Sequence, residues 1–233
     1  MVQSQDKIFV WLITNGSDMY DRELTRVVFN TKENRPKAVE MLNFLLDLQY
    51  GSKVSMPFEA GRDTTALFTQ GKAAIIEGGN WNLPRYKETL PDLDMDIIMY
   101  PAGPSGSKPT THTWTNMQVL PAKTKNPDVA WSFLEFHSST KSLVQRMVIM
   151  GVNGPPLDMY KTPEWADIVK KIPAYARYPD VIIAGRYLDY RRYKEVEKAI
   201  LPFFQAVMLQ KQKPEEILGP AETAANEVLA SPA

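Results

Sequence analysis

The sequence contains no cysteine among its 233 residues. Disulfide bonds, thiolate catalysis and thiolate metal sites are therefore excluded, while the redox compartment stays undetermined. Histidine is almost as scarce, because the chain has 2, His112 and His137. They lie in different local patterns and do not indicate a zinc site. His137 falls at the end of a predicted helix, where capping is the ordinary role. We expect neither a metal nor a cofactor.

The chain also lacks an excess of charge and any long apolar run. Lys and Arg number 27 and balance 27 Asp and Glu, so no basic field attracts nucleic acid. Apolar runs such as "IFVWLI" and "AAII" are far shorter than the roughly 20 residues that span a bilayer. No charged and then apolar leader opens the chain. The 44% hydrophobic content is enough for a soluble protein with one large domain or two small ones.

Hydrophobic periodicity and turn residues predict alternating helices and strands. The "KIFVWLIT" run, residues 7–14, fits either a strand or the end of a helix. Helical spacing puts Ala38, Met41, Leu42, Leu45 and Leu48 on one face, and "NPDVAWSFLEFHSS" with "TKSLVQRMVIMG" forms a helical hairpin. Strands are expected over 25–30, 72–79, 95–101 and 112–121, the second of them buried on both faces. Helices are expected over 31–49, 61–71, 82–90, 126–138, 140–150, 162–172, 187–210 with a kink at Pro202, and 213–230.

Catalytic patterns are weak in this sequence. Glu77 could pair with a nearby aspartate for glycoside hydrolysis, but closeness in the sequence does not give the separation between carboxylates that this reaction needs. No G-x-S-x-G motif is present, and the "GPSG" of residues 103–106 is better explained as a loop than as a phosphate site. The aspartates that could partner Glu77 are Asp92, Asp94 and Asp96.

Aromatic side chains at the ends of elements are the stronger signal. Trp81 follows a predicted strand and turn, and Trp114 follows the proline-rich stretch "PAGPSGSKPTT". Tyr187, Tyr190 and Tyr193 are spaced three apart at the start of a predicted helix. Rings with polar edges suit a pyranose, which is apolar on its face and hydroxylated at its rim. Core packing is the alternative for each ring, and it is the role expected for Trp11, Trp131 and Trp165.

The order of several segments resembles a known family. "AVEMLNFLLDLQ" is followed by "ALFTQGKAAIIEGGNW", then "MDIIMYPAGPSG", then "VLPAKTKNPDVAWSFLEFHSSTKSLVQRMVIMGVNGPP". The most specific piece is F-x-x-G-K-A-A-I-x-x-G-x-W, from Phe68 to Trp81. This order is similar to the second half of the family 1 extracellular solute-binding proteins, the maltose-binding-protein-like family that captures sugars for bacterial ATP-driven importers.

The resemblance implies an α/β fold of the type II periplasmic-binding-protein kind, in which two lobes close around a ligand. Residues 1–103 are expected in the second lobe, residues 104–156 in the hinge crossing and a helical hairpin of the first lobe, and residues 157–233 in the second lobe again. Family members begin with a secretion leader and a complete first lobe, and neither precedes residue 1. The chain is therefore expected to be a fragment that lacks most of the first lobe.

The resemblance also implies non-catalytic capture of a carbohydrate in the interlobe cleft, with Trp81 as the stacking residue. Near the crossing, where the family often has small glycine residues, this chain has "HTWTN", which suggests an altered ligand shape. Importer membrane subunits are the implied protein partners, and the implied location is the periplasm or the extracellular surface. The residues expected to contact the ligand are Trp81, Trp114, Asn80, His112, Thr113, Arg186, Tyr187, Asp189 and Tyr190.

The helical hairpin carries two apolar stripes with little surface to cover them. It is expected to pack in a non-native position or to contact another chain, since an apolar patch of this size favours self-association. Two alternatives to sugar capture stay open at this point. One is a glycoside-hydrolase-like enzyme that uses Glu77, and the other is a helical protein-interaction module.

Overall fold

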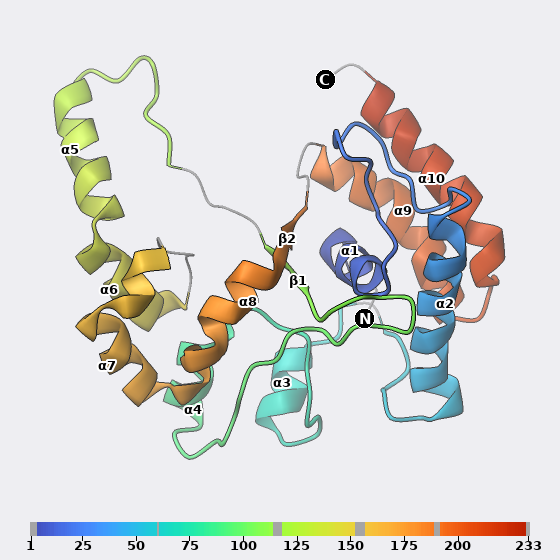
Figure 1. The fold of residues 1–233 in the computed structure, drawn as a ribbon, viewed down its shortest axis with the longest axis horizontal. Coiled ribbons are helices and arrows are strands. Elements are labelled where there is room, and N and C mark those ends of the chain that lie inside the picture. The colour runs from blue at the N-terminus through green and yellow to red at the C-terminus, as the bar shows by residue number, and fades with distance from the viewer. Residues whose placement is uncertain (1–3, 60, 114–117, 152–156, 189–191, 232–233) are drawn as a thin grey trace. The chain divides into compact units, whose positions relative to one another are not determined.

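The computed structural model describes residues 4–59, 61–113, 118–151, 157–188 and 192–231 (Figure 1). They form two compact units, each with an apolar core of its own. Unit 1 is drawn from residues 1–62, 99–113 and 184–233, and unit 2 from residues 63–98 and 114–183. None of the helices in these described ranges combines the length and apolarity needed to cross a membrane. The lobe boundaries expected after residues 103 and 156 stay a prediction.

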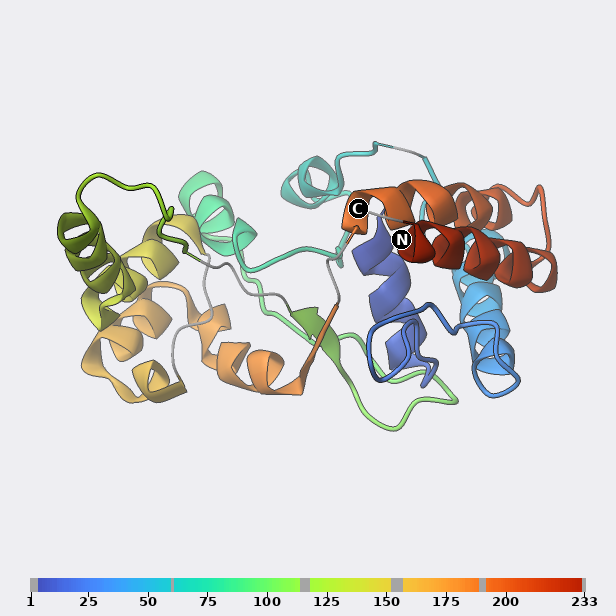
Figure 2. The ribbon, with the colours of Figure 1, turned by 90° about the horizontal axis from the view of Figure 1, so that it is seen from above.

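Unit 1 is built on four helices packed around one core. Helices α9 and α10 run side by side, as Figure 2 shows, and both contact α2. Phe29 and Phe204 meet edge to face in this core, with ring centroids 5.7 Å apart. The elements are α1 (Gln5–Thr14), α2 (Asn34–Leu46) with a π-helical extension (Asp47–Gly51), β1 (Thr111–Thr113), β2 (Gly185–Tyr187), α9 (Tyr193–Met208) and α10 (Pro214–Ala230).

The helical pattern read from the sequence accounts for α2. Ala38, Met41, Leu42 and Leu45 are all buried, and Leu48 packs partly buried against the same core. These side chains fall on one stripe of the helix because three and four residues complete about one turn. Of the two interpretations of residues 7–14, the structure shows the helix, α1.

Three of the predicted strands are wrong. Residues 72–79 and 95–101 form no strand, and Ile75, expected in a buried strand, is 78% exposed. Residues 25–30 contribute a single antiparallel bridge between Tyr20 and Val27. Residues 95–101 likewise contribute an isolated antiparallel bridge, between Tyr100 and Thr110. A strand needs a neighbour that pairs with it over several residues, and among the described residues these segments find at most one such bridge each. An apolar, β-favouring composition was therefore not enough to predict a strand in these segments.

Only the first two of the described residues in the fourth predicted strand, 112–121, are in a strand, β1; residues 114–117 lie outside the described residues, and residues 118–121 form no strand. β1 pairs with β2 in parallel, with Thr111 opposite Gly185, His112 opposite Arg186 and Thr113 opposite Tyr187. The helix expected from residue 187 is wrong at its start, because this pairing holds Tyr187 extended and α9 begins at Tyr193. Helix α9 then continues through Pro202.

Unit 2 is helical, with a small aromatic core. Trp165 lies edge on to Tyr160 at 4.8 Å and to Tyr175 at 5.8 Å between ring centroids. Leu83 of α4 and Met147 of α6 pack into the same core. The elements are α3 (Thr64–Thr69), α4 (Asn82–Thr89), α5 (Pro127–Ser138), α6 (Thr140–Met150), α7 (Pro163–Lys171), α8 (Tyr178–Ala184) and two 3₁₀ turns (Leu157–Lys161 and Pro173–Arg177).

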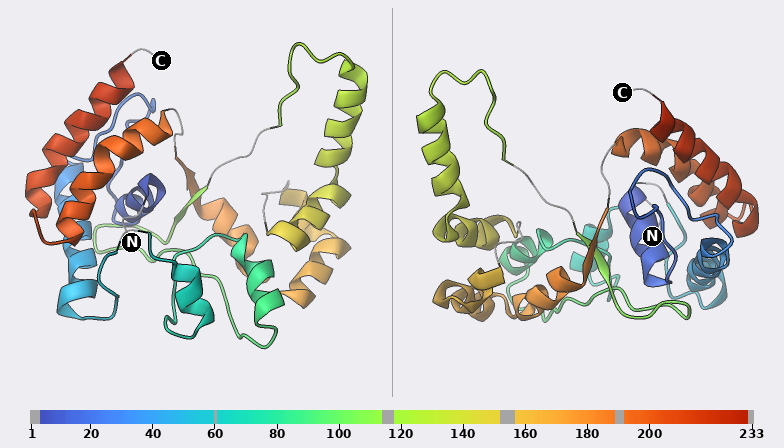
Figure 3. Two further views of the ribbon diagram at one scale, coloured as in Figure 1. Left: turned by 180° about the vertical axis from the view of Figure 1, so that it is seen from behind. Right: turned by 45° about the horizontal axis from the view of Figure 1, so that its top comes forward.

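Helices α5 and α6 confirm the predicted hairpin, and they lie next to each other in both views of Figure 3. Gly151 ends α6 in the left-handed conformation, at φ +64°, as its sequence position predicts. Trp165 is buried as expected, whereas the core assignment of Trp131 is wrong, because Trp131 is 58% exposed on α5.

Candidate functional site

The β1–β2 pair brings together four of the residues expected to contact the ligand. His112 and Thr113 lie on β1, and Arg186 and Tyr187 lie opposite them on β2. Successive side chains of a strand point to opposite faces, so His112 and Arg186 share one face and Thr113 and Tyr187 share the other. The four residues therefore form two pairs, and a ligand lying against one face of the pair of strands meets one pair.

Arg186 is held by the loop that follows α1. Its Nη2 donates to Oδ1 of Asp18 at 2.7 Å, and both side chains are about half exposed. The backbone N–H of Asp18 in turn donates to Oδ1 of the buried Asn34 at 3.1 Å. An ion pair this exposed contributes roughly 0.2–1 kcal/mol to stability. The ion pair thus positions the Arg186 guanidinium, but it is weak enough for a ligand to replace Asp18.

His112 lies half-buried beside α1, near Asp6 and Lys7. Burial lowers the pKa of His112 from 6.5 to about 4; Lys7 acts in the same direction and Asp6 opposes it. The imidazole is consequently neutral at physiological pH. One ring nitrogen of a neutral imidazole donates a hydrogen bond and the other accepts one. Both ring nitrogens of His112 are buried, so the guanidinium of Arg186 is the more accessible polar group on this face.

Trp81 sits immediately before α4 in unit 2 and is 43% exposed. The next turn of the helix places Leu83 and Tyr86 in the interior, so the chain buries its apolar residues there while leaving this indole partly in solvent. The indole lies against the backbone of Gly79, at a place that a Cβ atom would fill. Trp81 is therefore a partly open aromatic surface and not a plug in the core.

Asn80, next to Trp81, is turned toward the end of α6, where its side-chain amide donates to the carbonyl oxygen of Gly151. Tyr193, which shared the predicted tyrosine spacing, donates its hydroxyl toward Asp6 and Glu197 inside unit 1. Burial and these two carboxylates raise the pKa of the Tyr193 phenol. Three further residues expected at the site, Trp114, Asp189 and Tyr190, lie outside the described residues and stay predictions.

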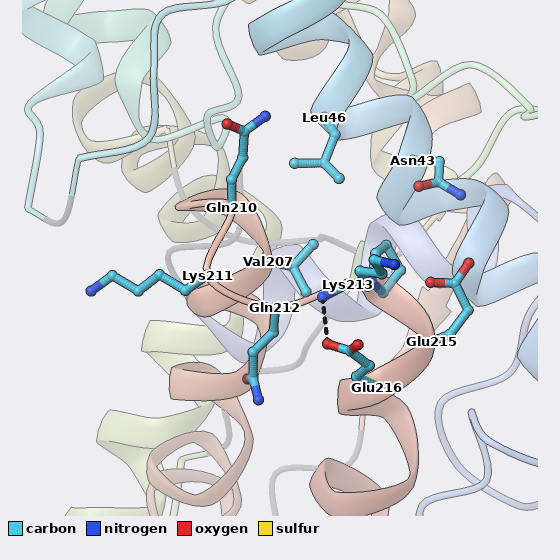
Figure 4. Close-up of a pocket in the computed structure, with 10 residues that line it drawn as sticks. Asn43, Leu46, Val207, Gln210, Lys211, Gln212, Lys213, Glu215 and Glu216 are labelled. Carbon is cyan, nitrogen blue, oxygen red and sulfur yellow. Dashed lines mark hydrogen bonds between the residues drawn. The ribbon is translucent and has the colours of Figure 1, made fainter.

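Two surface hollows were not expected from the sequence. The larger, about 560 Å³, lies in unit 1 between α2, the end of α9 and the start of α10. Figure 4 shows Leu46 and Asn43 of α2 on one side and the loop Gln210–Lys213 on the other, with the backbone N–H of Lys213 bonded to Glu216 at 3.0 Å. The smaller, about 240 Å³, is mainly apolar and lies between α4, α6 and α7. The residues that line them include no predicted ligand contact.

The three aspartates considered as partners of Glu77 all lie at the surface. Asp96 accepts from Nε of Arg177 at 2.5 Å, and Asp92 and Asp94 are exposed at the surface. Within the described part of the chain, no three His, Asp or Glu side chains are close enough together to hold a metal ion. The described site residues offer an exposed guanidinium and two partly exposed aromatic rings, Trp81 and Tyr187.

Solved structures of sugar-binding proteins share this fold. The maltose/maltodextrin-binding domain of Bdellovibrio bacteriovorus bound to maltotriose matches with a TM-score of 0.74 at 20% identity, covering 96% of this chain and 57% of that one. An ABC transporter solute-binding protein of Thermotoga lettingae bound with α-D-tagatose gives 0.70 at 20% identity, covering 97% and 57%. The substrate-binding protein of Listeria monocytogenes in complex with cycloalternan gives 0.73 at 17%, covering 100% and 58%. The type II periplasmic-binding-protein fold is thus confirmed.

Sequence comparison points the same way. A curated binding protein of Brucella abortus (strain 2308) is 31% identical over 77 residues, which are 33% of this chain and 18% of that protein. The chain therefore spans little of this relative and a little over half of the solved structures. Residues 6–174 match the family described as bacterial extracellular solute-binding protein. Because this match covers most of the chain, the protein belongs to the bacterial extracellular solute-binding proteins.

Proposed function

We propose that the chain captures a carbohydrate, without chemistry, for an ATP-driven bacterial importer. The observation that carries the proposal is the partly open indole of Trp81, supported from below by Gly79. Members of the same fold are bound to maltotriose, tagatose and cycloalternan, which are all carbohydrates. A partly exposed indole ring suits the apolar face of a pyranose, and such a stack contributes on the order of 1 kcal/mol beyond the burial of area.

The polar pair on the β1–β2 strands suits the rim of a sugar. Arg186, about half exposed, donates through several N–H groups, and the neutral His112 beside it has its ring nitrogens buried. Thr113 and Tyr187 face the other way, so the pair of strands offers a polar face and a face with an exposed ring. We assign the His112–Arg186 face to hydroxyl binding, because the exposed guanidinium of Arg186 offers several donors there.

The importer and the location belong to the same proposal. The family is described as extracellular, and the Thermotoga lettingae neighbour is a solute-binding protein of an ABC transporter. We therefore propose membrane subunits of such an importer as partners, and the periplasm or the cell surface as the location. A hydrolytic role for Glu77 has no support from the family or the neighbours, which are binding proteins.

The test is a titration of intrinsic tryptophan fluorescence with a panel of mono- and oligosaccharides that includes maltotriose. A saturable change is expected in the parent chain, and Trp81→Ala should weaken it by at least about five-fold, the equivalent of one aromatic stack. Trp131→Ala is the matched control, because it removes another exposed tryptophan of unit 2 that has no role in the proposal. Equal responses in both variants would overturn the role of Trp81.

A second comparison separates the two faces of the β1–β2 pair. Arg186→Met should reduce the affinity for the sugar, whereas Thr113→Val on the opposite face should leave it nearly unchanged. The reverse order would show that hydroxyls are bound on the Thr113–Tyr187 face. Release of reducing sugar by the parent chain, lost in Glu77→Gln, would instead establish the enzyme.

A further inference from the structure

We propose that Gly79, Asn80 and Gly151 are positioning residues that hold the indole of Trp81 in one orientation. The importance of this orientation for sugar capture rests on the proposed function, whereas the positioning itself rests on contacts within unit 2. It also gives Asn80 a role different from the direct ligand contact that the sequence suggested.

Gly79 supports the ring. A Cβ atom built at Gly79 would come within 3.0 Å of the Cε3, Cζ3 and Cη2 atoms of Trp81, closer than real Cβ atoms come to any neighbour. The six-membered part of the indole therefore lies directly on the glycine backbone. The neighbouring Gly78 differs, because a Cβ there would meet the end of the flexible Asn82 side chain at 3.2 Å and no part of the ring.

Gly151 supports the backbone that carries the ring. It ends α6 at φ +64°, a conformation that glycine adopts without a steric penalty. A Cβ built at Gly151 would lie 2.7 Å from Cα of Trp81 and 2.9 Å from the carbonyl carbon of Asn80. The chain before α4 therefore rests directly on the end of α6, and any side chain at residue 151 would push it away.

Asn80 fastens the two segments together. Its side-chain amide donates to the carbonyl oxygen of Gly151, and its own carbonyl oxygen accepts from the backbone N–H of Leu83 at 3.2 Å. The hydroxyl of the buried Tyr175 lies 3.5 Å from the same carbonyl and 3.4 Å from that of Met147 in α6. A side-chain hydrogen bond with Asn80 also opposes the rise that burial causes in the pKa of Tyr178.

Through these contacts the Asn80 side chain is hydrogen-bonded within unit 2, and the indole of Trp81 is held in one orientation. A ring that is already fixed loses little conformational freedom when a ligand stacks on it, which is the advantage of preorganisation. The positioning residues should therefore control affinity through the ring, with no contact of their own to the sugar.

The experiment uses the full chain labelled with 5-fluorotryptophan and recorded by ¹⁹F NMR. The chain has 5 tryptophans, and Trp81→Phe identifies the resonance of Trp81. Gly79→Ala should shift that resonance and change its H₂O/D₂O isotope shift, because the new methyl group displaces the Trp81 ring from its position against residue 79. The resonances of the other tryptophans report whether the rest of the chain remains folded. Gly78→Ala is the matched control and should leave Trp81 unchanged.

Gly151→Ala has a control of its own. Gly71 is also left-handed, at φ +67°, but nothing lies within 4 Å of a Cβ built there. Both substitutions carry the backbone penalty of a left-handed alanine, so the effect present only in Gly151→Ala comes from the contact with Asn80 and Trp81. Asn80→Asp, which removes the donor to Gly151, should move the Trp81 resonance in the same direction as Gly151→Ala.

An unmoved Trp81 resonance in Gly79→Ala, with the chain folded, overturns the inference. So does an equal movement in Gly78→Ala, or in Gly71→Ala compared with Gly151→Ala. Titration with maltotriose then tests the proposed function separately. If the parent chain binds, Gly79→Ala should weaken binding by about five-fold, the value of one lost stack. If the parent chain does not bind but the ring still moves as stated, the proposed function fails while the positioning stands.

Discussion

Replacing Phe133 and Phe136 with glutamate should abolish a weak self-association of this chain. The two rings lie on one face of α5 with Val129, because these positions are three and four residues apart. At roughly 200 Å² per ring, exposures of 59% and 64% leave about 240 Å² of aromatic surface in water. At about 25 cal/mol per Å², covering it contributes at most ~6 kcal/mol per copy.

Two copies that meet through the same face gain about twice this amount, against an association cost of roughly 4–15 kcal/mol. The balance predicts a weak dimer whose population rises with concentration through the micromolar and millimolar range. Light scattering coupled to size-exclusion chromatography measures the mass, and binding of an apolar dye reports the exposed patch. Both signals should fall in the double glutamate variant.

Trp131 provides the control for this prediction. It is as exposed as the two phenylalanines but points to a different side of α5, so Trp131→Glu should leave the mass unchanged. The substituted positions are all at the surface, so loss of folding is not expected to confuse the comparison. A parent chain that remains a monodisperse monomer at every concentration would refute the reasoning, as would equal effects of Trp131→Glu and the double variant.

Two further predictions concern stability. Burial lowers the pKa of His112 from 6.5 to about 4, so the unfolded chain gains this proton first as the pH falls. The contribution of the neutral His112 to the free energy of unfolding is therefore complete above about pH 6.5 and is lost as the pH falls toward 4. Urea unfolding at several pH values should show that the free energy of unfolding of His112→Gln depends less on pH over this window than that of the parent chain. The same pH dependence in both chains would contradict the assignment. Phe204→Ala should cost roughly 3–5 kcal/mol, since the ring is fully buried edge on to Phe29. Phe44→Ala, at an exposed site, should cost much less, and equal midpoints in urea for the two variants would be inconsistent with this core.

Local patterns predicted the helices well and the strands poorly. The stripe of α2, the hairpin α5–α6 and the end of α6 at Gly151 depend on residues close in the sequence, and all are present. Residues 72–79 have the composition of a strand, yet a strand forms by pairing with a distant segment. Nothing in an apolar run says whether such a segment is available, so the prediction failed where the structure depends on partners.

The candidate site was predictable as a set of residues but not as a geometry. Tryptophan at the end of an element suggested an accessible ring, and Trp81 is partly exposed. The register that pairs His112 with Arg186 could not be read from the sequence, because it joins two distant segments. The role of Gly79 was equally hidden: a glycine before a tryptophan indicates a turn, whereas its missing side chain here makes room for the ring.

The contact between Arg186 and Asp18 has a consequence for any solute that needs this guanidinium. The Asp18 carboxylate competes with the solute, because it already accepts a hydrogen bond from the Arg186 guanidinium before the solute binds. The measured affinity then combines the intrinsic affinity with the work of releasing the carboxylate. Added salt weakens an exposed ion pair of this kind. An uncharged solute would therefore find Arg186 more available at high ionic strength, the opposite of the trend for a ligand held by its own charge.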